Sequence, residues 1–153
     1  SRRLYGMYAR ELFLGGADRD FLEAENYFQT QVASPDRSTD EITEGCCVAA
    51  KAARLRGDAV SFFKYTSKVI AGDGCSEICC ELGHFYEETG DFEEAAVWYY
   101  NAAYETQPVL ALRSSEEEPL QGLIRCYEQL GLPAQARSYA EELKHRQNEQ
   151  TDN

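Results

Sequence analysis

Residues 82–102 read "LGHFYEETGDFEEAAVWYYNA", and this stretch decides the fold. A Thr-Gly-Asp sequence at 89–91 divides it into two amphipathic halves. Small residues fall where two antiparallel helices could approach closely, and aromatic residues can fill the space around them. In the similar sequence "RGD" at 56–58, Gly57 suits the C-cap of one helix and Asp58 the N-cap of the next, which makes it a helix–helix turn. The stretch therefore predicts a helical hairpin. It contains no nucleophile paired with a base and no phosphate-binding loop.

The same kind of turn recurs along the chain. "LRGD" contains Gly57, "ETGD" contains Gly90 and "QLGL" contains Gly131. The first two glycines are 33 residues apart, and the last two are 41 apart. A period near 34 residues is typical of tetratricopeptide (TPR) hairpins, and the longer interval indicates extra loop residues before the third of these turns.

Helical periodicity extends over the rest of the chain, and no stretch alternates as a strand would. We expect one all-α domain over residues 1–153, a superhelical stack of about four antiparallel hairpins. Their predicted ranges are 2–33, 38–71, 75–107 and 115–147, with "LALRSSEEEP" at 110–119 as a loop. Asp18 is the expected N-cap of the second helix, and the fourth helix is expected to carry the apolar residues Val60, Phe63, Val69 and Ile70. The mid-helix start without Met predicts a fragment of a longer chain.

Residues 79–102 closely resemble the TPR motif. The matching positions are, in order, Cys79, Leu82, Gly83, Tyr86, Gly90, Ala95, Tyr99 and Ala102. Copies at 120–143 and 46–69 match less fully, and a degenerate hairpin at 4–33 is expected to act as a cap, since terminal repeats are usually atypical. The resemblance implies a TPR-like solenoid that binds protein.

A second resemblance covers most of the chain. "YARELFLGGADRDFLEAENYF", "ARLRGD" and "EICCELGHFYEETGDFEEAAVWY" look like the segment after the catalytic domain in bacterial family-2 glycosyltransferases with C-terminal TPRs. In that family the catalytic machinery lies N-terminal to the repeats, so this segment would be non-catalytic. Asp18 and Asp20 have the spacing of that family's metal motif, but a helix start explains them better because no strand precedes them.

Net charge and hydropathy limit the classes of partner that the chain is expected to bind. The net charge is −12, and residues 75–153 carry 5 basic and 16 acidic side chains. Nucleic acids and anionic membranes require a basic patch, so neither is an expected partner. No apolar run reaches the roughly 20 residues that a membrane helix needs. We expect a cytoplasmic domain whose partner is a basic or neutral protein segment.

The pattern of the six cysteines indicates thiols that pack in the core rather than metal ligands or redox-active groups. Four of them form adjacent pairs, and no set of Cys-x-x-Cys or His spacings completes a tetrahedral site. We therefore expect buried thiols and no cofactor or metal, with metal or redox chemistry as the alternative. His84 and His145 have no evident partner in the sequence, which argues against an enzyme. His84 is expected to be either a surface residue or a ligand-contacting one.

In a stack of helical hairpins, the first helix of each pair lines the concave face. By repeat position, the predicted protein-binding groove contains Glu44, Cys47, Lys51, Glu77, Cys80, His84, Glu87, Glu118, Gln121 and Arg125. Few of these residues are cationic, so a clamp for a peptide carboxylate is not expected.

Two functions follow from these patterns. The first is an interaction module of a glycosyltransferase, which docks the acceptor polypeptide or forms a homodimer. The alternative is a free-standing TPR adaptor or scaffold with no enzyme attached.

Overall fold

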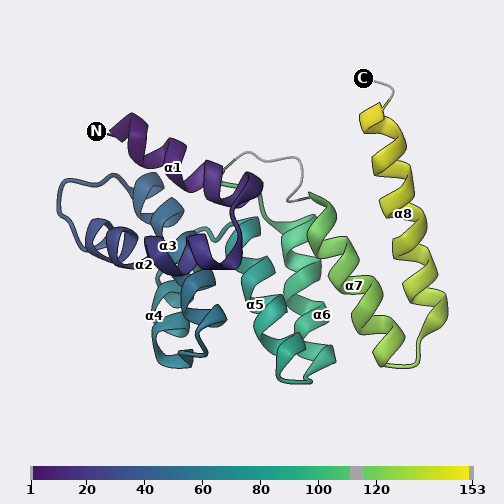
Figure 1. The fold of residues 1–153 in the computed structure, drawn as a ribbon. Coiled ribbons are helices and arrows are strands. Elements are labelled where there is room, and N and C mark those ends of the chain that lie inside the picture. Colours follow the sequence, from purple (N-terminus) through teal and green to yellow (C-terminus); the bar gives the residue numbers. More distant parts are fainter. Residues whose placement is uncertain (1, 111–115, 152–153) are drawn as a thin grey trace.

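The computed structural model describes residues 2–110 and 116–151, and over these residues it is all-α (Figure 1). Eight α-helices and one π-helical turn account for the regular structure of the described chain, which has no strand. The helices are α1 (Arg2–Gly15), α2 (Asp18–Val32), α3 (Thr39–Leu55), α4 (Ala59–Ile70), α5 (Ser76–Glu88), α6 (Phe92–Tyr100), α7 (Glu117–Gln129) and α8 (Pro133–Thr151). The π-helical turn η1 spans Asn101–Glu105. Within these ranges no helix combines the length and apolar character needed to cross a bilayer.

The three predicted turns share one geometry. Gly57, Gly90 and Gly131 each have a positive φ, between 73° and 84°, which glycine adopts without the steric penalty of a Cβ. In each turn the residue after the glycine donates its N–H to the carbonyl five residues earlier, at 2.9 Å. This is the Schellman arrangement that closes a helix C-terminus. Asp58 caps α4, as predicted, and Asp91 caps α6 in the same way.

These turns produce three hairpins, α3–α4, α5–α6 and α7–α8, which stand side by side (Figure 1). One group of buried side chains fills the space around α3, α4 and α5, and another lies between α5, α6, α7 and α8. The close packing of consecutive helices is consistent with a helical repeat.

The first two helices pair differently from the later hairpins. α1 and α2 meet through aromatic rings, including Tyr5 with Phe28 and Phe13 with Phe21, whose centroids are 5.2 and 5.0 Å apart. α2 packs closely on α3, and the Tyr5 hydroxyl donates to the carbonyl of Glu41 on α3 at 2.6 Å. Helices α1 and α2 together cover the face of α3 that carries Val48 and Ala52.

Small residues admit a tyrosine ring between the second and third hairpins. A Cβ placed on Gly83 of α5 would lie 2.6 Å from the Tyr99 ring, and one on Gly122 of α7 would lie 2.5 Å from it. Tyr99, on α6, is completely buried. Its ring therefore occupies a slot that only glycine leaves open on both sides.

Several sequence expectations were wrong in detail. The N-cap of α2 is Ala17, not Asp18, and the Asp20 carboxylate accepts the Ala17 N–H at 2.9 Å. Val60 is 83% exposed, because the buried face of α4 carries Phe62 and Tyr65 instead. Helix α6 widens into the unpredicted π-helical turn η1. Of the predicted loop at 110–119, residues 111–115 lie outside the described residues, as does the predicted start of the last hairpin at 115.

The Asp58 cap is expected to make stability depend on pH in acid. Hydrogen bonds from the Ser61 hydroxyl and N–H, together with Arg56, lower the pKa of Asp58 from 3.8 to about 2. A lowered folded-state pKa contributes stability that is present above pH 3.8 and is lost as the pH falls toward 2. Asp58→Asn keeps a capping side chain but cannot titrate. Urea unfolding should show a stability difference between the two proteins above about pH 4 that disappears near pH 2. A difference that is independent of pH would contradict this assignment.

Candidate functional site

The predicted groove residues lie on α3, α5 and α7, the first helices of the three hairpins. Five of them, Cys80, His84, Glu87, Glu118 and Arg125, come together where α5 faces α7. Gln121 is exposed on α7 beside them, while Glu44 and Lys51 are partly exposed on α3. The Lys51 ammonium lies over the Phe21 ring, 4.3 Å from its centroid.

Three of the predicted groove residues, Glu77, Cys47 and Cys80, are buried, and the first two have structural roles. The carboxylate of Glu77, which is 4% exposed, accepts the N–H groups of Val109 and Leu110 at 3.0 and 2.9 Å. Cys47 is fully buried, with its Sγ atom 3.7 Å from that of Cys75. The assignment of these two residues to an open groove is therefore wrong. Glu77 fixes the segment that leaves the second hairpin, and Cys47 packs in the core.

His84 has partners on both sides of its ring, contrary to expectation. Its Nε2 atom lies 2.6 Å from Oε1 of Glu118 on α7, and its Nδ1 atom lies 2.7 Å from the hydroxyl of Tyr99 on α6. The second histidine, His145, also has a carboxylate neighbour, since its Nε2 atom is 3.1 Å from Oε1 of Glu149. His84 thus joins three helices, whereas His145 interacts within α8.

An ion pair between Arg125 and Glu87 extends the hydrogen bonds around His84 and Tyr99. The Arg125 guanidinium donates to both carboxylate oxygens of Glu87, at 2.8 and 3.0 Å, and the Tyr99 hydroxyl donates to Glu87 at 2.6 Å. Burial acts to raise the pKa of Glu87, but these hydrogen bonds hold it below its usual value. The hydrogen bond from His84 likewise lowers the pKa of Glu118. Both carboxylates are therefore ionised near neutral pH.

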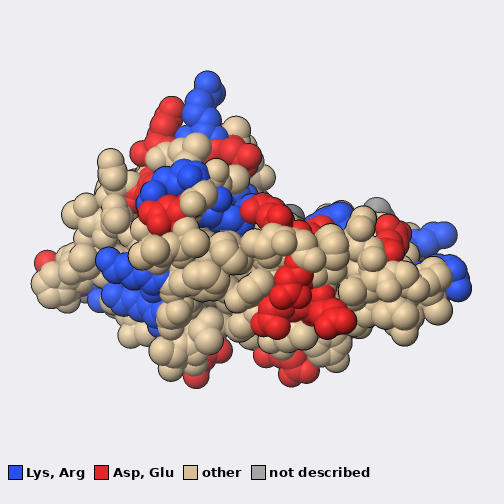
Figure 2. Space-filling model, turned by 90° about the horizontal axis from the view of Figure 1, so that it is seen from below, with Lys and Arg blue, Asp and Glu red and all other residues tan. Residues whose placement is uncertain are grey.

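A hollow opens beside this network. It has a volume of about 440 Å³, and its lining includes His84, Glu87, Phe92 and Arg125. Seen from below, acidic side chains gather over the middle of the molecule, where the α5–α6 hairpin lies (Figure 2). The hollow therefore combines an aromatic ring with charges of both signs at an acidic part of the surface.

Four further residues of this region, Arg54, Glu81, Glu88 and Tyr99, were not among the predicted groove residues. Arg54 of α3 pairs with the buried Glu81 of α5 at 2.7 Å and with Glu88 at 2.5 Å. Tyr99 was expected only to fill space, but its hydroxyl holds both His84 and Glu87. All four of these interactions join different helices. Spacing within one helix gives no signal for such partners.

The cysteines are buried, as predicted. All six have buried side chains and are free thiols. Cys80 lies 3.8 Å from His84 Nε2, but burial raises the pKa of its thiol well above the usual value. A reactive thiolate requires the opposite shift. The contact between Cys80 and His84 is therefore not an activated catalytic pair.

A second, apolar cleft lies on α6 and the turn between α7 and α8. Its volume is about 420 Å³, and Val97, Tyr100 and Leu132 line it with exposed side chains. These are among the large apolar residues that the fold leaves in contact with solvent. An exposed apolar cleft of this kind is a common feature of protein–protein contact surfaces.

Comparisons with protein-family models, with curated proteins and with solved structures found no match.

Proposed function

We propose that this chain is a non-catalytic, TPR-like helical repeat domain that binds a protein or peptide. The observation that carries the proposal is the row of three hairpins closed by the same kind of turn. Their first helices, α3, α5 and α7, carry exposed or partly exposed polar side chains, including Glu44 on α3 and the residues that line the hollow between α5 and α7. Stacked helical pairs commonly bind extended segments on such a face.

The partner segment is proposed to be basic or neutral. Burial, together with the nearby carboxylates Asp40 and Glu41, raises the pKa of Glu44 on α3. A cation bound beside Glu44 would relieve this unfavourable environment of its carboxylate. Glu87 and Glu118 already have internal partners, so the preference for a basic segment is modest there.

The parent protein is proposed from the resemblance alone. As the C-terminal region of a bacterial family-2 glycosyltransferase, the domain would dock the acceptor polypeptide. A free-standing adaptor is the alternative, and the coding sequence upstream of Ser1 distinguishes the two. A nucleotide-sugar-binding domain there supports the first, and a start codon supports the second.

Selection from a random peptide display library tests the binding function. Peptides recovered on the purified chain should be enriched in Lys and Arg over the unselected library. Glu44→Lys should weaken binding of a recovered basic peptide about fivefold, which corresponds to about 1 kcal/mol for an exposed ion pair. Fluorescence anisotropy with the labelled peptide measures this change.

The matched control is Glu141→Lys, which makes the same charge change at an exposed position on α8. It should leave the affinity within about twofold of the unsubstituted chain, because α8 is the second helix of its hairpin and long-range effects are screened. Recovery of acidic peptides, or equal losses in both variants, would overturn the proposed preference.

Homodimerisation is a second candidate, favoured by the exposed cleft around Val97, Tyr100 and Leu132. Light scattering over a range of concentrations distinguishes a 17.3 kDa monomer from a dimer of twice that mass. A dimer that Val97→Glu dissociates would assign this cleft to assembly. A monomer at every concentration would leave the hollow between α5 and α7 as the binding surface.

A further inference from the structure

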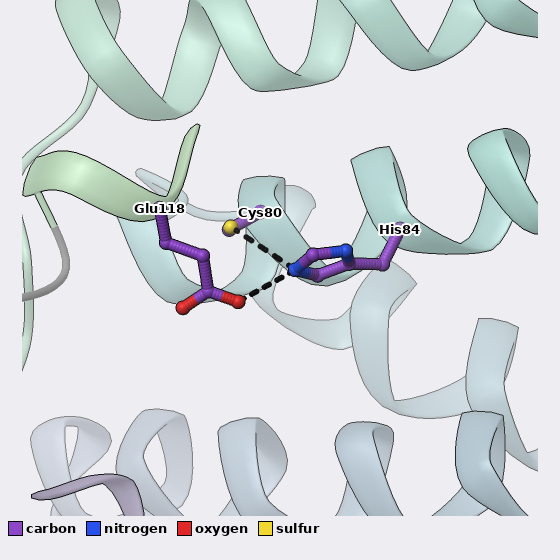
Figure 3. Close-up of side chains that lie close together, drawn as sticks. All are labelled: Cys80, His84 and Glu118. Carbon is purple, nitrogen blue, oxygen red and sulfur yellow. Dashed lines mark hydrogen bonds and ion pairs between the residues drawn. The ribbon is translucent and has the colours of Figure 1, made fainter. Parts of the chain in front are cut away.

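Three side chains of different chemistry converge at the junction of α5 and α7 (Figure 3). The Nε2 atom of His84 lies 3.8 Å from the Cys80 Sγ atom and 2.6 Å from Oε1 of Glu118. The three ligand atoms all lie within 4.8 Å of one another. We propose that Cys80, His84 and Glu118 form a zinc-binding site that joins the second hairpin to the third.

The local helix geometry explains how two of the ligands meet. Cys80 and His84 are four residues apart on α5, so both project from the same face of the helix. Glu118 lies in the first turn of α7 and reaches across to this face. The site therefore depends on two helices that are separated by the segment between the hairpins.

The hydrogen bonds around His84 make Nδ1 a donor to Tyr99, so that Nε2 can bind a metal ion once the proton it shares with Glu118 is released. Arg125 keeps the Glu87 carboxylate ionised, so this carboxylate only accepts hydrogen bonds. The single proton of the Tyr99 hydroxyl is donated to Glu87, and the Tyr99 oxygen must then accept the proton on His84 Nδ1. A metal-ligating histidine typically donates its other ring N–H to such a partner.

The distances suit a zinc ion after a small movement. Tetrahedral coordination with bonds of about 2.3 Å to sulfur and about 2.0 Å to nitrogen places these two atoms about 3.6 Å apart. The Cys80–His84 distance of 3.8 Å is close to this value. The Glu118–His84 distance of 2.6 Å is shorter than the roughly 3.3 Å between two such ligands in a tetrahedron, so the Glu118 oxygen would move away from Nε2. The Glu118 side chain is 49% exposed, which leaves room for this movement.

Charge and donor type favour zinc over harder cations. A thiolate and a carboxylate balance the two positive charges of the ion, and binding releases the Cys80 thiol proton to solvent together with any proton on His84 Nε2. The neighbouring Arg54 and Glu81 pair with each other. Sulfur and imidazole donors suit Zn²⁺, whereas Mg²⁺ and Ca²⁺ prefer oxygen ligands.

The site has an open side. Cys80 is 8% exposed and the His84 side chain is 18% exposed, so the thiol and imidazole are largely enclosed while Glu118 faces solvent. Three protein ligands leave a fourth tetrahedral position for water or for a side chain of another molecule. The zinc site requires no peptide partner, so it is independent of the binding function proposed above.

The test uses the purified chain, treated with a chelator and then titrated with Zn²⁺ and with Co²⁺ alone. Calorimetry should show one equivalent of Zn²⁺ bound, and Co²⁺ should give the absorption band of a thiolate-bound ion. Cys80→Ser should abolish that band. Glu118→Gln, at a half-exposed position, removes a direct ligand and should weaken Zn²⁺ binding by more than the roughly 10-fold lower limit for replacing an outer-shell partner of a metal ligand.

The matched control is His145→Gln, which removes the other histidine and its neighbouring carboxylate contact on α8. This variant should bind Zn²⁺ as the unsubstituted chain does, and circular dichroism verifies that every variant is folded. Failure of the unsubstituted chain to bind Zn²⁺ would overturn the site. Unchanged affinity in Glu118→Gln together with an unchanged cobalt band in Cys80→Ser would also overturn it.

Discussion

Tyr99→Ala is expected to lower the free energy of unfolding by about 3–5 kcal/mol, the range for truncating a buried aromatic side chain. The Tyr99 ring is completely buried between Gly83 of α5 and Gly122 of α7, where added Cβ atoms would lie 2.6 and 2.5 Å from it. Its removal leaves a cavity where three helices meet. Urea denaturation followed by circular dichroism measures the loss, and the thermal midpoint should fall by roughly 10 °C.

Two further substitutions distinguish packing from hydrogen bonding. Tyr99→Phe keeps the ring and removes only the hydroxyl that contacts His84 and Glu87, so it should cost about 1–2 kcal/mol. Gly122→Ala keeps Tyr99 but closes its slot, and overpacking should cost about 1–3 kcal/mol. If Tyr99→Ala were no more destabilising than Tyr99→Phe, the ring would not be the main contact between the hairpins.

Arg54→Met is the second substitution with a large expected effect, a loss of about 3–5 kcal/mol in the free energy of unfolding. The Arg54 side chain is 9% exposed, and its guanidinium lies 2.7 Å from the Glu81 carboxylate, which is also buried. Removing the cation leaves Glu81 charged and without this partner in the interior. Urea denaturation near neutral pH measures the loss.

The control for Arg54 is a double-mutant cycle. Replacing both partners, Arg54→Met with Glu81→Met, should recover most of the stability, because an apolar pair of similar volume avoids the desolvation of two charges. If the double variant were as unstable as the sum of the single ones, the ion pair would not be the cause of the loss.

The hairpin turns could be predicted from sequence because their physics is local. A glycine that tolerates positive φ and an aspartate that caps the next helix act within a few residues, so the turns at Gly57 and Gly90 and the Asp58 cap were predicted correctly. The burial of the cysteines also followed from the periodicity around them. The all-α fold rests on these short-range preferences.

The errors in the predicted groove have a different origin. Glu77 occupies a groove position in the repeat pattern, but the segment leaving η1 returns over it and supplies two N–H donors. Such a partner is more than 30 residues away in the chain and has no regular spacing. Cys47 was misplaced because a small apolar side chain at the same position packs inward just as readily.

Only part of the proposed zinc site could be recognised from the sequence. The spacing of Cys80 and His84 places two ligands on one helix face and could have been noticed from the sequence. Glu118 was predicted on the same groove, yet its contact with His84 depends on how α7 packs against α5. The two residues are 34 positions apart in the chain, and no periodic pattern within one helix reveals such a contact.

The helices that pack most closely are neighbours or next-but-one neighbours along the chain. This order has a consequence for how the domain forms. Each turn closes a short loop, so the entropy lost in bringing one hairpin together is small and similar from one hairpin to the next. Structure can therefore nucleate in any of the three hairpins and spread to its neighbours, and a topology with such local contacts folds fast.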